Sequence, residues 1–398
     1  MRHHRILFFF TSTLVLIGFF LLIPIFFEQR SASYDDAHTQ PLDQITQNTA
    51  TIQTLPQPIK PSHITTPKQV KALYLTGWVA GLEGRRNAII DLLNRTEANA
   101  VVIDIKDYTG VLSFKPNDPE LISYGAGTNR IANLESAIEA FHKKGIYVIG
   151  RIVAFQDPYF LSKNLKEGVT DKTTGGLWHD RKGISWIDPG SIKAREYLVR
   201  LGQEVYERGF DELNFDYIRF PTDGKMENIV YPISGIRTKR EVINEFFQYL
   251  KTSFSDPHIP ISADIFGMTT TASDDMGIGQ VFEDALNAFD YVAPMVYPSH
   301  FGNGWQGIAY PAKEPYRIIT LSLGKGVERA KAIGKDPTII RPWLQDFNLG
   351  ATYTKEMVEA QIKATYDLGL NSWMLWDPAN TYTESALEKE PTEHIETE

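Results

Sequence analysis

The chain contains no cysteine, so disulfide bonds, thiolate nucleophiles and cysteine-ligated zinc are all excluded. Beyond its first few residues it also has no block of Lys or Arg, and its formal net charge is −9. Proteins that bind polyanions usually present clustered positive charge, so a nucleic acid is not expected as a partner. A neutral or cationic substrate fits this charge better.

The signatures of several other enzyme classes are missing too. No Gly-rich phosphate-binding pattern follows the first predicted strand, and no P-loop occurs. No G-x-S-x-G elbow supports serine hydrolysis. The histidines form no H-x-x-H or H-E-x-x-H pattern, so neither a catalytic metal nor another cofactor is expected, although a calcium site built from carboxylates stays open.

A long apolar run stands out near the N-terminus. Residues 6–27 carry no charge, with Arg2 and Arg5 before them and Glu28 after them. The run is long enough to span a bilayer as a helix, and bulky residues occupy the place where a signal-peptide cleavage site would need small ones. We therefore expect residues 1–28 to be a transmembrane signal anchor. The preceding positive charge keeps the N-terminus in the cytoplasm and places the rest of the chain on the extracytoplasmic side, at the cell surface.

Two polar stretches flank the part of the chain that has a globular composition. Residues 29–68 are rich in Thr, Gln, Ser and Pro, which predicts a flexible linker, and residues 386–398 are expected to be a disordered tail. Residues 69–385 alternate between short apolar runs and longer segments of helical period, as repeated βα units do. Eight such units predict an α/β fold, a closed (β/α)8 TIM barrel, with an open doubly wound sheet as the alternative. The predicted strands are Lys71 to Val79, Ala100 to Lys106, Ile146 to Phe155, Phe210 to Ile218, Ile259 to Phe266, Asp290 to Tyr297, Thr338 to Phe347 and Leu370 to Asp377.

Polar and charged residues recur where these strands end. In a TIM barrel the active site lies at the C-terminal ends of the strands, and isolated carboxylates are costly inside a dry barrel, so a solvated pocket that holds a polar substrate is expected there. The candidate side chains are Asp104, Lys106, Arg151, Asn214, Asp216, Arg219, Asp264, Asp346 and Asp377.

Aromatic residues accompany them and suit stacking against the apolar face of a sugar. Those at strand ends, assigned to substrate binding, are Tyr297, Trp343 and Trp376, and those in the connecting loops are Tyr108, Tyr124, Trp178, Trp186, Trp305 and Tyr310. Each loop ring has an alternative role as a plug that fixes its own loop to the barrel.

Hydrolysis of a glycosidic bond needs two carboxyl groups on either side of that bond. Because side chains alternate along a strand, Asn214 and Asp216 share one face, and Ser262 and Asp264 share the corresponding face of the next strand. Neighbouring strands lie about 4.8 Å apart, so Asp216 and Asp264 are the best candidate pair. A salt bridge of Asp216 with Arg219 or Arg151 is the alternative, purely structural explanation.

Four runs carry a resemblance to a known family: VKALYLTGWVAG, AVVIDIKDYTGVLSF, GFDELNFDYIRFP and NSWMLWDPANTY. Together they resemble a family of glycoside hydrolases catalogued as a domain of unknown function, a TIM barrel distantly related to the α-amylase-like enzymes. The resemblance covers about residues 70–382, and FDYIRFP is its most specific part.

The α-amylase-like pattern implies roles for three aspartates. Asp216 stands where that pattern has its nucleophile, Asp264 where it has a glutamate acid/base, and Asp346 where it has a stabilising aspartate. The sequence departs from the pattern at Asn214, where an arginine is expected and for which Arg219 is a possible replacement.

The resulting expectation is a membrane-anchored glycoside hydrolase that acts on an extracellular or cell-envelope polysaccharide. Its alternatives are a catalytically inactive, glycan-binding or scaffolding barrel, and a lyase or transferase that uses the same site. Nothing in the sequence indicates an oligomeric state.

Overall fold

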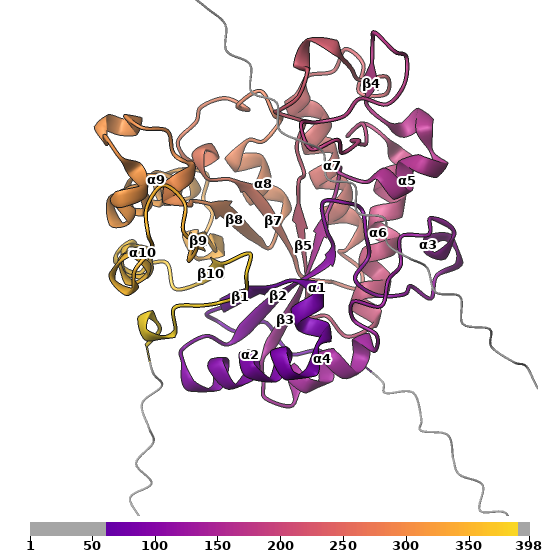
Figure 1. Ribbon diagram of the computed structural model, residues 1–398. Helices are drawn as coiled ribbons and strands as arrows, with labels where there is room; N and C mark the ends of the chain where they lie inside the picture. The colour runs from indigo at the N-terminus through magenta and orange to yellow at the C-terminus, as the bar shows by residue number, and fades with distance from the viewer. Residues whose placement is uncertain (1–60, 389–398) are drawn as a thin grey trace, which may run out of the picture. The chain divides into compact units, whose positions relative to one another are not determined.

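The structure is a computed structural model that describes residues 61–388 (Figure 1). The predicted anchor, most of the predicted linker and residues 389–398 lie outside the described residues. Eight parallel strands close a barrel in the order β1-β10-β9-β8-β7-β5-β3-β2, which confirms the predicted (β/α)8 architecture. The barrel strands are β1 (Lys71–Leu75), β2 (Ala100–Lys106), β3 (Tyr147–Val153), β5 (Glu212–Asp216), β7 (Ile261–Phe266), β8 (Tyr291–Met295), β9 (Trp343–Gln345) and β10 (Trp373–Trp376).

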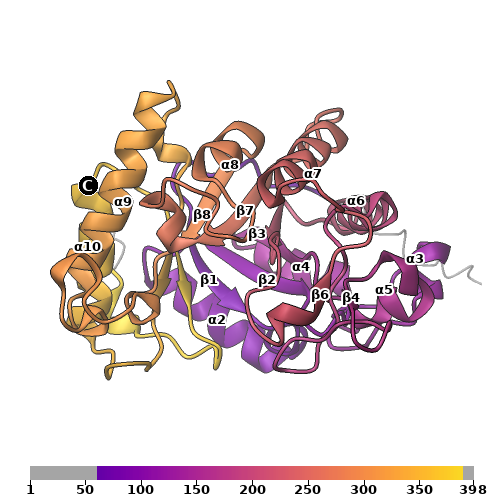
Figure 2. The same cartoon turned by 90° about the horizontal axis from the view of Figure 1, so that it is seen from above.

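Helices lie outside the ring of strands, as the two views at right angles show (Figures 1 and 2). They are α1 (Gly77–Gly81), α2 (Glu83–Arg95), α3 (Pro119–Ser123), α4 (Leu134–His142), α5 (Pro158–Lys163), α6 (Ile192–Glu207), α7 (Lys239–Ser253), α8 (Phe282–Ala288), α9 (Pro315–Ala332) and α10 (Lys355–Asp367). β4 (Thr170–Asp171) and β6 (Ile229–Val230) form a separate two-stranded antiparallel sheet. None of the helices within residues 61–388 has the length and apolarity to cross a membrane.

Seven of the eight predicted strands are shorter in the structure, all but Ala100 to Lys106, and for two of them the local reason is plain. The first was expected to reach Val79, but the Thr76 hydroxyl accepts a hydrogen bond from the Val79 amide and begins α1. The seventh was expected over Thr338 to Phe347, where the structure has a 3-10 turn at its start and pairs only the three residues of β9. Pro342 precedes those three residues and has no amide hydrogen for the ladder.

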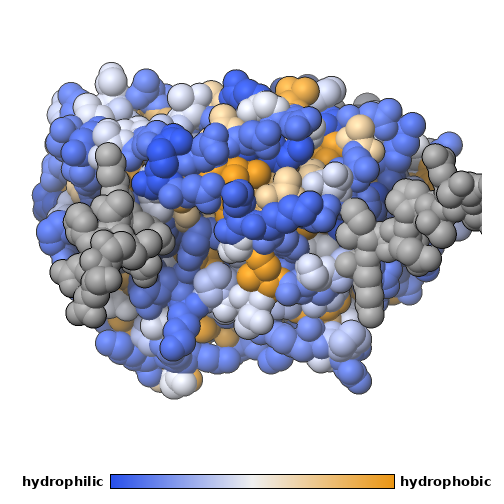
Figure 3. Space-filling view, turned by 90° about the horizontal axis from the view of Figure 1, so that it is seen from below, coloured by the Kyte–Doolittle hydropathy of each residue, from blue (hydrophilic) through white to orange (hydrophobic). Residues whose placement is uncertain are grey.

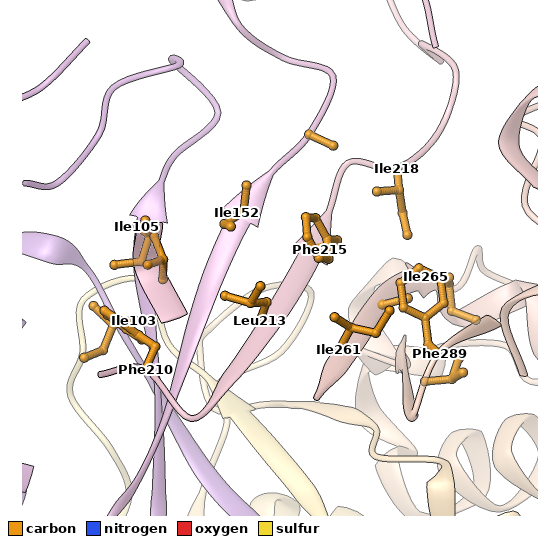
Figure 4. Close-up of a cluster of buried hydrophobic side chains, with 14 of the residues drawn as sticks. Ile103, Ile105, Ile152, Phe210, Leu213, Phe215, Ile218, Ile261, Ile265 and Phe289 are labelled. Carbon is orange, nitrogen blue, oxygen red and sulfur yellow. The ribbon is translucent and has the colours of Figure 1, made fainter. Parts of the chain in front are cut away.

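The main apolar core fills the space between the barrel and its helices. Alternate strand residues point outward into it, among them Leu213 and Phe215 of β5 and Ile261 and Ile265 of β7 (Figure 4). Each is almost completely buried, and burial of such a side chain contributes about 1.5–3 kcal/mol. The predicted outward orientation of Leu213 and Phe215 is confirmed, which turns the polar residues of β5 inward.

Three residues of β5 form successive polar levels inside the barrel. At the start of the strand Glu212 accepts hydrogen bonds from Arg341 and from the Tyr147 hydroxyl. Asn214 occupies the middle level, and Asp216 lies at the C-terminal end of the strand. The residues between these levels are mainly aromatic and aliphatic, so the interior is a packed core rather than a pore.

The barrel is not equally well paired all round. β2 and β3 are aligned over six residue pairs, whereas β8 and β9 share only Met295 and Trp343, with one further bridge between Val292 and Ile340. We refer to this junction of β8 and β9 as the β8–β9 seam.

The segment before β1 already packs against the barrel. The Ile64 amide donates to Asp211 (2.7 Å), and the Thr66 hydroxyl lies 2.9 Å from that of Tyr147. The part of the linker after residue 61 is therefore docked at the end of the barrel where the strands begin. Figure 3 shows one face of the surface, where apolar residues form separate small patches on a mainly hydrophilic background.

Candidate active site

A cavity of about 630 Å³ opens at the C-terminal ends of the barrel strands. Asp216, Phe266, Met295 and Trp376, the last residues of four strands, reach it directly. The lining residues are Arg151, Asp216, Tyr217, Arg219, Asp264, Phe266, Gly267, Met268, Met295, Tyr297, His300, Phe301, Phe347 and Trp376. Six of the residues predicted for a site thus share one cavity: Arg151, Asp216, Arg219, Asp264, Tyr297 and Trp376.

Asp216 is held by donors on both of its oxygens. Arg151 donates to Oδ2 through Nε (3.1 Å) and through Nη2, and the Tyr217 amide donates to Oδ1 (2.6 Å). Tyr217 has φ of 52°, a left-handed conformation that is costly for a residue with a side chain. The strain lies directly beside the candidate catalytic carboxylate and fixes its orientation.

Asp264 lies deeper, with 1% of its surface exposed. Its Oδ1 accepts hydrogen bonds from Asn214 Nδ2 (2.9 Å) and Trp343 Nε1 (2.7 Å). Burial, and next the negative charge of Asp216, raise the pKa of Asp264 to about 8. Asn214, Trp343 and Arg151 oppose that rise, but Asp264 still keeps its proton at neutral pH.

The two carboxyl groups flank the same arginine. Arg151 Nε lies 3.1 Å from Asp216 Oδ2 and 3.7 Å from Asp264 Oδ2. Because both distances end on one nitrogen, the two oxygens are at most about 7 Å apart. This upper limit includes the carboxyl spacing of retaining glycosidases.

Arg151 also binds a third carboxyl group, that of Asp104, through Nη1 (2.5 Å). The Tyr74 hydroxyl donates to the other oxygen of Asp104, and the ring of Tyr74 stacks on that of Trp376. Burial raises the pKa of Asp104 as it does that of Asp264. Three carboxyl groups thus surround one guanidinium, and Asp104 acts on the cavity by positioning Arg151.

Arg219 was named as a possible source of the guanidinium beside Asp216, but in the structure Arg151 supplies it. Arg151 of the neighbouring strand β3 occupies that place, while Arg219 packs its guanidinium against aromatic rings. The alternative explanation of Asp216, a salt bridge with an arginine, is therefore present in the structure. It coexists with an open cavity that both residues line.

Lys106, Asp346 and Asp377 do not line the cavity. Lys106 is fully buried and pairs with Asp157 (2.9 Å), because a bulge in β2 shifts the register after Asp104 and turns its side chain away from the interior. Asp346 accepts hydrogen bonds from the amide and hydroxyl of Thr383, and Asp377 accepts from backbone amides of its own loop. These two carboxylates fix loops, and burial raises the pKa of Asp346 to about 6.

Asn214 and Trp343 do not line the cavity either, and they reach it only through their hydrogen bonds to Asp264. None of the loop aromatics lines it, and Trp178 and Trp186 are buried against the segment that follows β5, where they contact Lys225 and Arg219. The apolar wall comes instead from residues at or after the ends of β7, β8 and β9, and the sequence analysis did not identify them: Phe266, Met268, Met295, Phe301 and Phe347. His300 lines the cavity with them. Their position at or after a strand end is the available signal, the same one that indicates Tyr297 and Trp376.

In the part of the chain that the structure describes, no group of three or more His, Asp or Glu side chains is arranged to hold a metal ion. The ionisable side chains that line the cavity are Arg151, Asp216, Tyr217, Arg219, Asp264, Tyr297 and His300.

Several solved structures are similar to this chain. A hypothetical protein from Ruminiclostridium thermocellum is 37% identical, over 52% of this chain and 98% of that chain, with a TM-score of 0.44. The spore cortex-lytic enzyme SleL of Bacillus megaterium is 10% identical, over 81% and 73%, with a TM-score of 0.48. An α-galactosidase from Thermus thermophilus, solved with stachyose, is 12% identical, over 81% and 64%, with a TM-score of 0.48. No curated protein matches the chain.

A family model matches residues 72–382, which reach from β1 to beyond β10, and it confirms the resemblance seen in the sequence. The chain belongs to the family of enzymes described as "Putative glycosyl hydrolase domain".

Proposed function

We propose that this protein hydrolyses glycosidic bonds of an extracellular or cell-envelope polysaccharide, with Asp216 as nucleophile or base and Asp264 as proton donor. The observation that carries the proposal is the contrast between two carboxyl groups in one cavity. Asp264 is buried and its pKa is raised to about 8, so it holds a proton to give. Asp216 accepts hydrogen bonds from the Arg151 guanidinium and the Tyr217 amide, and because these groups can only donate, they suit an ionised carboxylate.

The reaction follows from these roles. Asp264 gives its proton to the oxygen of the leaving sugar, and the carboxylate of Asp216 attacks the anomeric carbon or removes a proton from the attacking water. The upper limit on their separation includes the shorter spacing of retaining enzymes and the low end of the inverting range. Asp346 takes no part, because it lies outside the cavity.

Substitution of Asp216 tests the proposal. The full-length protein and its Asp216→Asn variant would be incubated with a panel of polysaccharides, and new reducing ends would be measured. We expect Asp216→Asn to lower the rate at least about 10²-fold. Asp346→Asn is the matched control, because it removes a carboxylate from the same rim but outside the cavity, and it should keep most of the activity.

An inactive glycan-binding barrel is the competing function, and the ion pair between Asp216 and Arg151 is the observation in its favour. Retention of hydrolysis in Asp216→Asn, or equal loss in both variants, would contradict our assignment. Glycan binding without any new reducing ends from the wild-type protein would support the competing function instead.

We also propose that residues 6–27 anchor the protein in a membrane with the barrel on the extracytoplasmic side. The support is the uncharged apolar run with Arg2 and Arg5 before it. Deletion of residues 1–28 should move the protein from the membrane to the soluble fraction. An external protease should digest the barrel in intact cells, and protection of the barrel there would refute this orientation.

A further inference from the structure

Arg219 lines the cavity next to Asp216 but is not used in the proposed mechanism. It is 9% exposed, and its Nη1 donates to the Phe220 carbonyl (3.1 Å) and to the Thr222 hydroxyl (3.2 Å). Its Nε and Nη2 have no hydrogen-bond partner among residues 61–388. A buried guanidinium thus keeps one edge, Nε with Nη2, free of protein acceptors.

Aromatic rings hold the plane of this guanidinium. Its central carbon lies 4.8 Å from the ring centre of Phe266 and 5.1 Å from those of Trp186 and Tyr217. Such contacts favour a cation and restrict its movement, so the free edge is preorganised for a ligand. Burial lowers the pKa of Arg219, but a guanidinium stays charged at physiological pH.

Buried charges in proteins are normally paired, and Arg219 forms no ion pair within the described part of the chain. Asp216, Asp223 and Asp180 act on it only at longer range. Asp216 is engaged by Arg151, and Asp180 accepts hydrogen bonds from Gln156 and from Trp186. Within residues 61–388, therefore, no carboxylate forms an ion pair with Arg219, and its Nε–Nη2 edge is available to a ligand.

Other arginines of this chain show what the free edge binds. Arg240, for example, donates through Nε (2.8 Å) and Nη2 (2.9 Å) to the two oxygens of Asp284. The same two nitrogens hold a carboxylate at Arg95, Arg208 and Arg329. This planar, two-point geometry matches a carboxylate better than a single charge.

We propose that Arg219 binds the carboxylate of an acidic sugar, so that the substrate is a polysaccharide that contains uronic acid. This inference deepens the proposed function and rests on it for the presence of a sugar in the cavity. Arg219 and Asp216 line the same cavity, so the acidic sugar would bind in the cavity in which the bond is cut. The net charge of −9 had favoured a neutral or cationic substrate, but the local charge at Arg219 is positive.

Binding of simple sugars tests this without any need for hydrolysis. Calorimetry on the full-length protein in detergent would compare D-glucuronate with D-glucose and D-galacturonate with D-galactose. We expect at least one uronate to bind about tenfold or more tightly than its neutral counterpart. Glucose 6-phosphate offers a phosphate, which a guanidinium can also bind at two points, so it tests whether the site prefers a carboxylate to another anion. We expect it to bind less tightly than the preferred uronate.

Variants then locate the effect. Arg219→Gln should weaken uronate binding at least about tenfold and leave the neutral sugars unchanged, and Arg219→Lys should be intermediate because it keeps the charge but loses the two-point geometry. Arg181→Gln is the control, since it removes an exposed arginine of a neighbouring loop that does not line this cavity. Circular dichroism would establish that each variant is folded.

The proposal is overturned if wild-type protein shows no preference for either uronate, if glucose 6-phosphate binds most tightly, or if the preference survives in Arg219→Gln. If Arg219→Gln does not fold, two measurements still test the proposal: the comparison of uronates with neutral sugars in the wild-type protein, and uronate binding by Arg219→Lys. Hydrolysis of a neutral polysaccharide that is lost in Asp216→Asn would overturn the acidic substrate and leave the proposed function standing. Uronate binding without hydrolysis of any polysaccharide would overturn the proposed function and leave the carboxylate site at Arg219 standing.

Discussion

Replacement of Trp343 by phenylalanine removes one hydrogen-bond donor from Asp264 and keeps an aromatic ring in its place. Trp343 is fully buried, and its Nε1 lies 2.7 Å from Oδ1 of Asp264. This donor favours the charged form of the carboxyl group, so it opposes the rise in the pKa of Asp264 that burial and Asp216 cause. Without the donor, the pKa of Asp264 should rise further above 8.

The size of the change follows from the strength of the bond. A hydrogen bond to a charged group contributes about 1.5–3 kcal/mol, and one pKa unit corresponds to about 1.4 kcal/mol. The pKa of Asp264 should therefore rise by about one to two units. A proton donor is active while protonated, so activity is lost as the pH rises through this pKa. In Trp343→Phe the loss should occur at correspondingly higher pH.

The measurement is kcat/KM as a function of pH, because its alkaline limb reports the proton donor of the free enzyme. Trp373→Phe is the matched control: Trp373 is also fully buried, but its Nε1 donates to the Tyr366 hydroxyl, remote from Asp264. An alkaline limb that stays in place or moves to lower pH in Trp343→Phe would refute Asp264 as the proton donor. An equal movement in Trp373→Phe would show a general effect on the fold.

Three further predictions concern stability and the shape of the cavity. The folded protein raises the pKa of Asp264 from 3.8 to about 8, so ionisation of Asp264 disfavours the fold. The contribution of Asp264 to stability should therefore fall as the pH rises between those two values. Asp264→Asn should remove that fall in curves of Tm against pH, and it should abolish activity. Arg151→Met leaves three buried carboxyl groups without their partner, so it should lower the free energy of unfolding in urea by about 3–5 kcal/mol. Arg95→Met breaks an exposed ion pair and should lower it by less than about 1 kcal/mol. A Cβ at Gly267 would lie 2.4 Å from a backbone oxygen of β8, so Gly267→Ala should lower the stability of the fold by about 1–3 kcal/mol and should lower activity. Gly84→Ala is the control, because no atom lies within 4 Å of the added carbon. In thermal unfolding it should be neutral or stabilising.

Much of the site can be predicted from the alternation of side chains along a strand, in which every second residue faces the same side. The alternation of Leu213 and Phe215 with Asn214 and Asp216 is visible in the sequence, and it decides which residues of β5 face the interior. Asp264 follows from the same argument on the next strand. The rule failed at Lys106, because a bulge adds one residue and reverses the alternation after it. A bulge has no signature in a run of apolar residues.

The choice of Arg151 over Arg219 could not be predicted from the sequence. Arg151 is paired in register with Asn214, one level below Asp216, and only the length of its side chain brings the guanidinium to the upper level. Asp346 and Asp377 each lie one residue beyond the end of a strand, where a carboxylate either turns into the cavity or accepts hydrogen bonds from a loop. The loop conformation decides between these outcomes, and it depends on contacts distant in sequence such as that with Thr383.

The β8–β9 seam divides the cavity into two halves that differ in stiffness. Arg151, Asp216 and Asp264 are carried by β3, β5 and β7, which are joined by continuous ladders of backbone hydrogen bonds. Met295 and Phe347 lie on either side of the seam, where few such bonds join the strands. Local opening of a protein begins where such bonds are fewest. We therefore expect the half of the cavity that carries Arg151, Asp216 and Asp264 to keep its geometry while the opposite wall moves more readily.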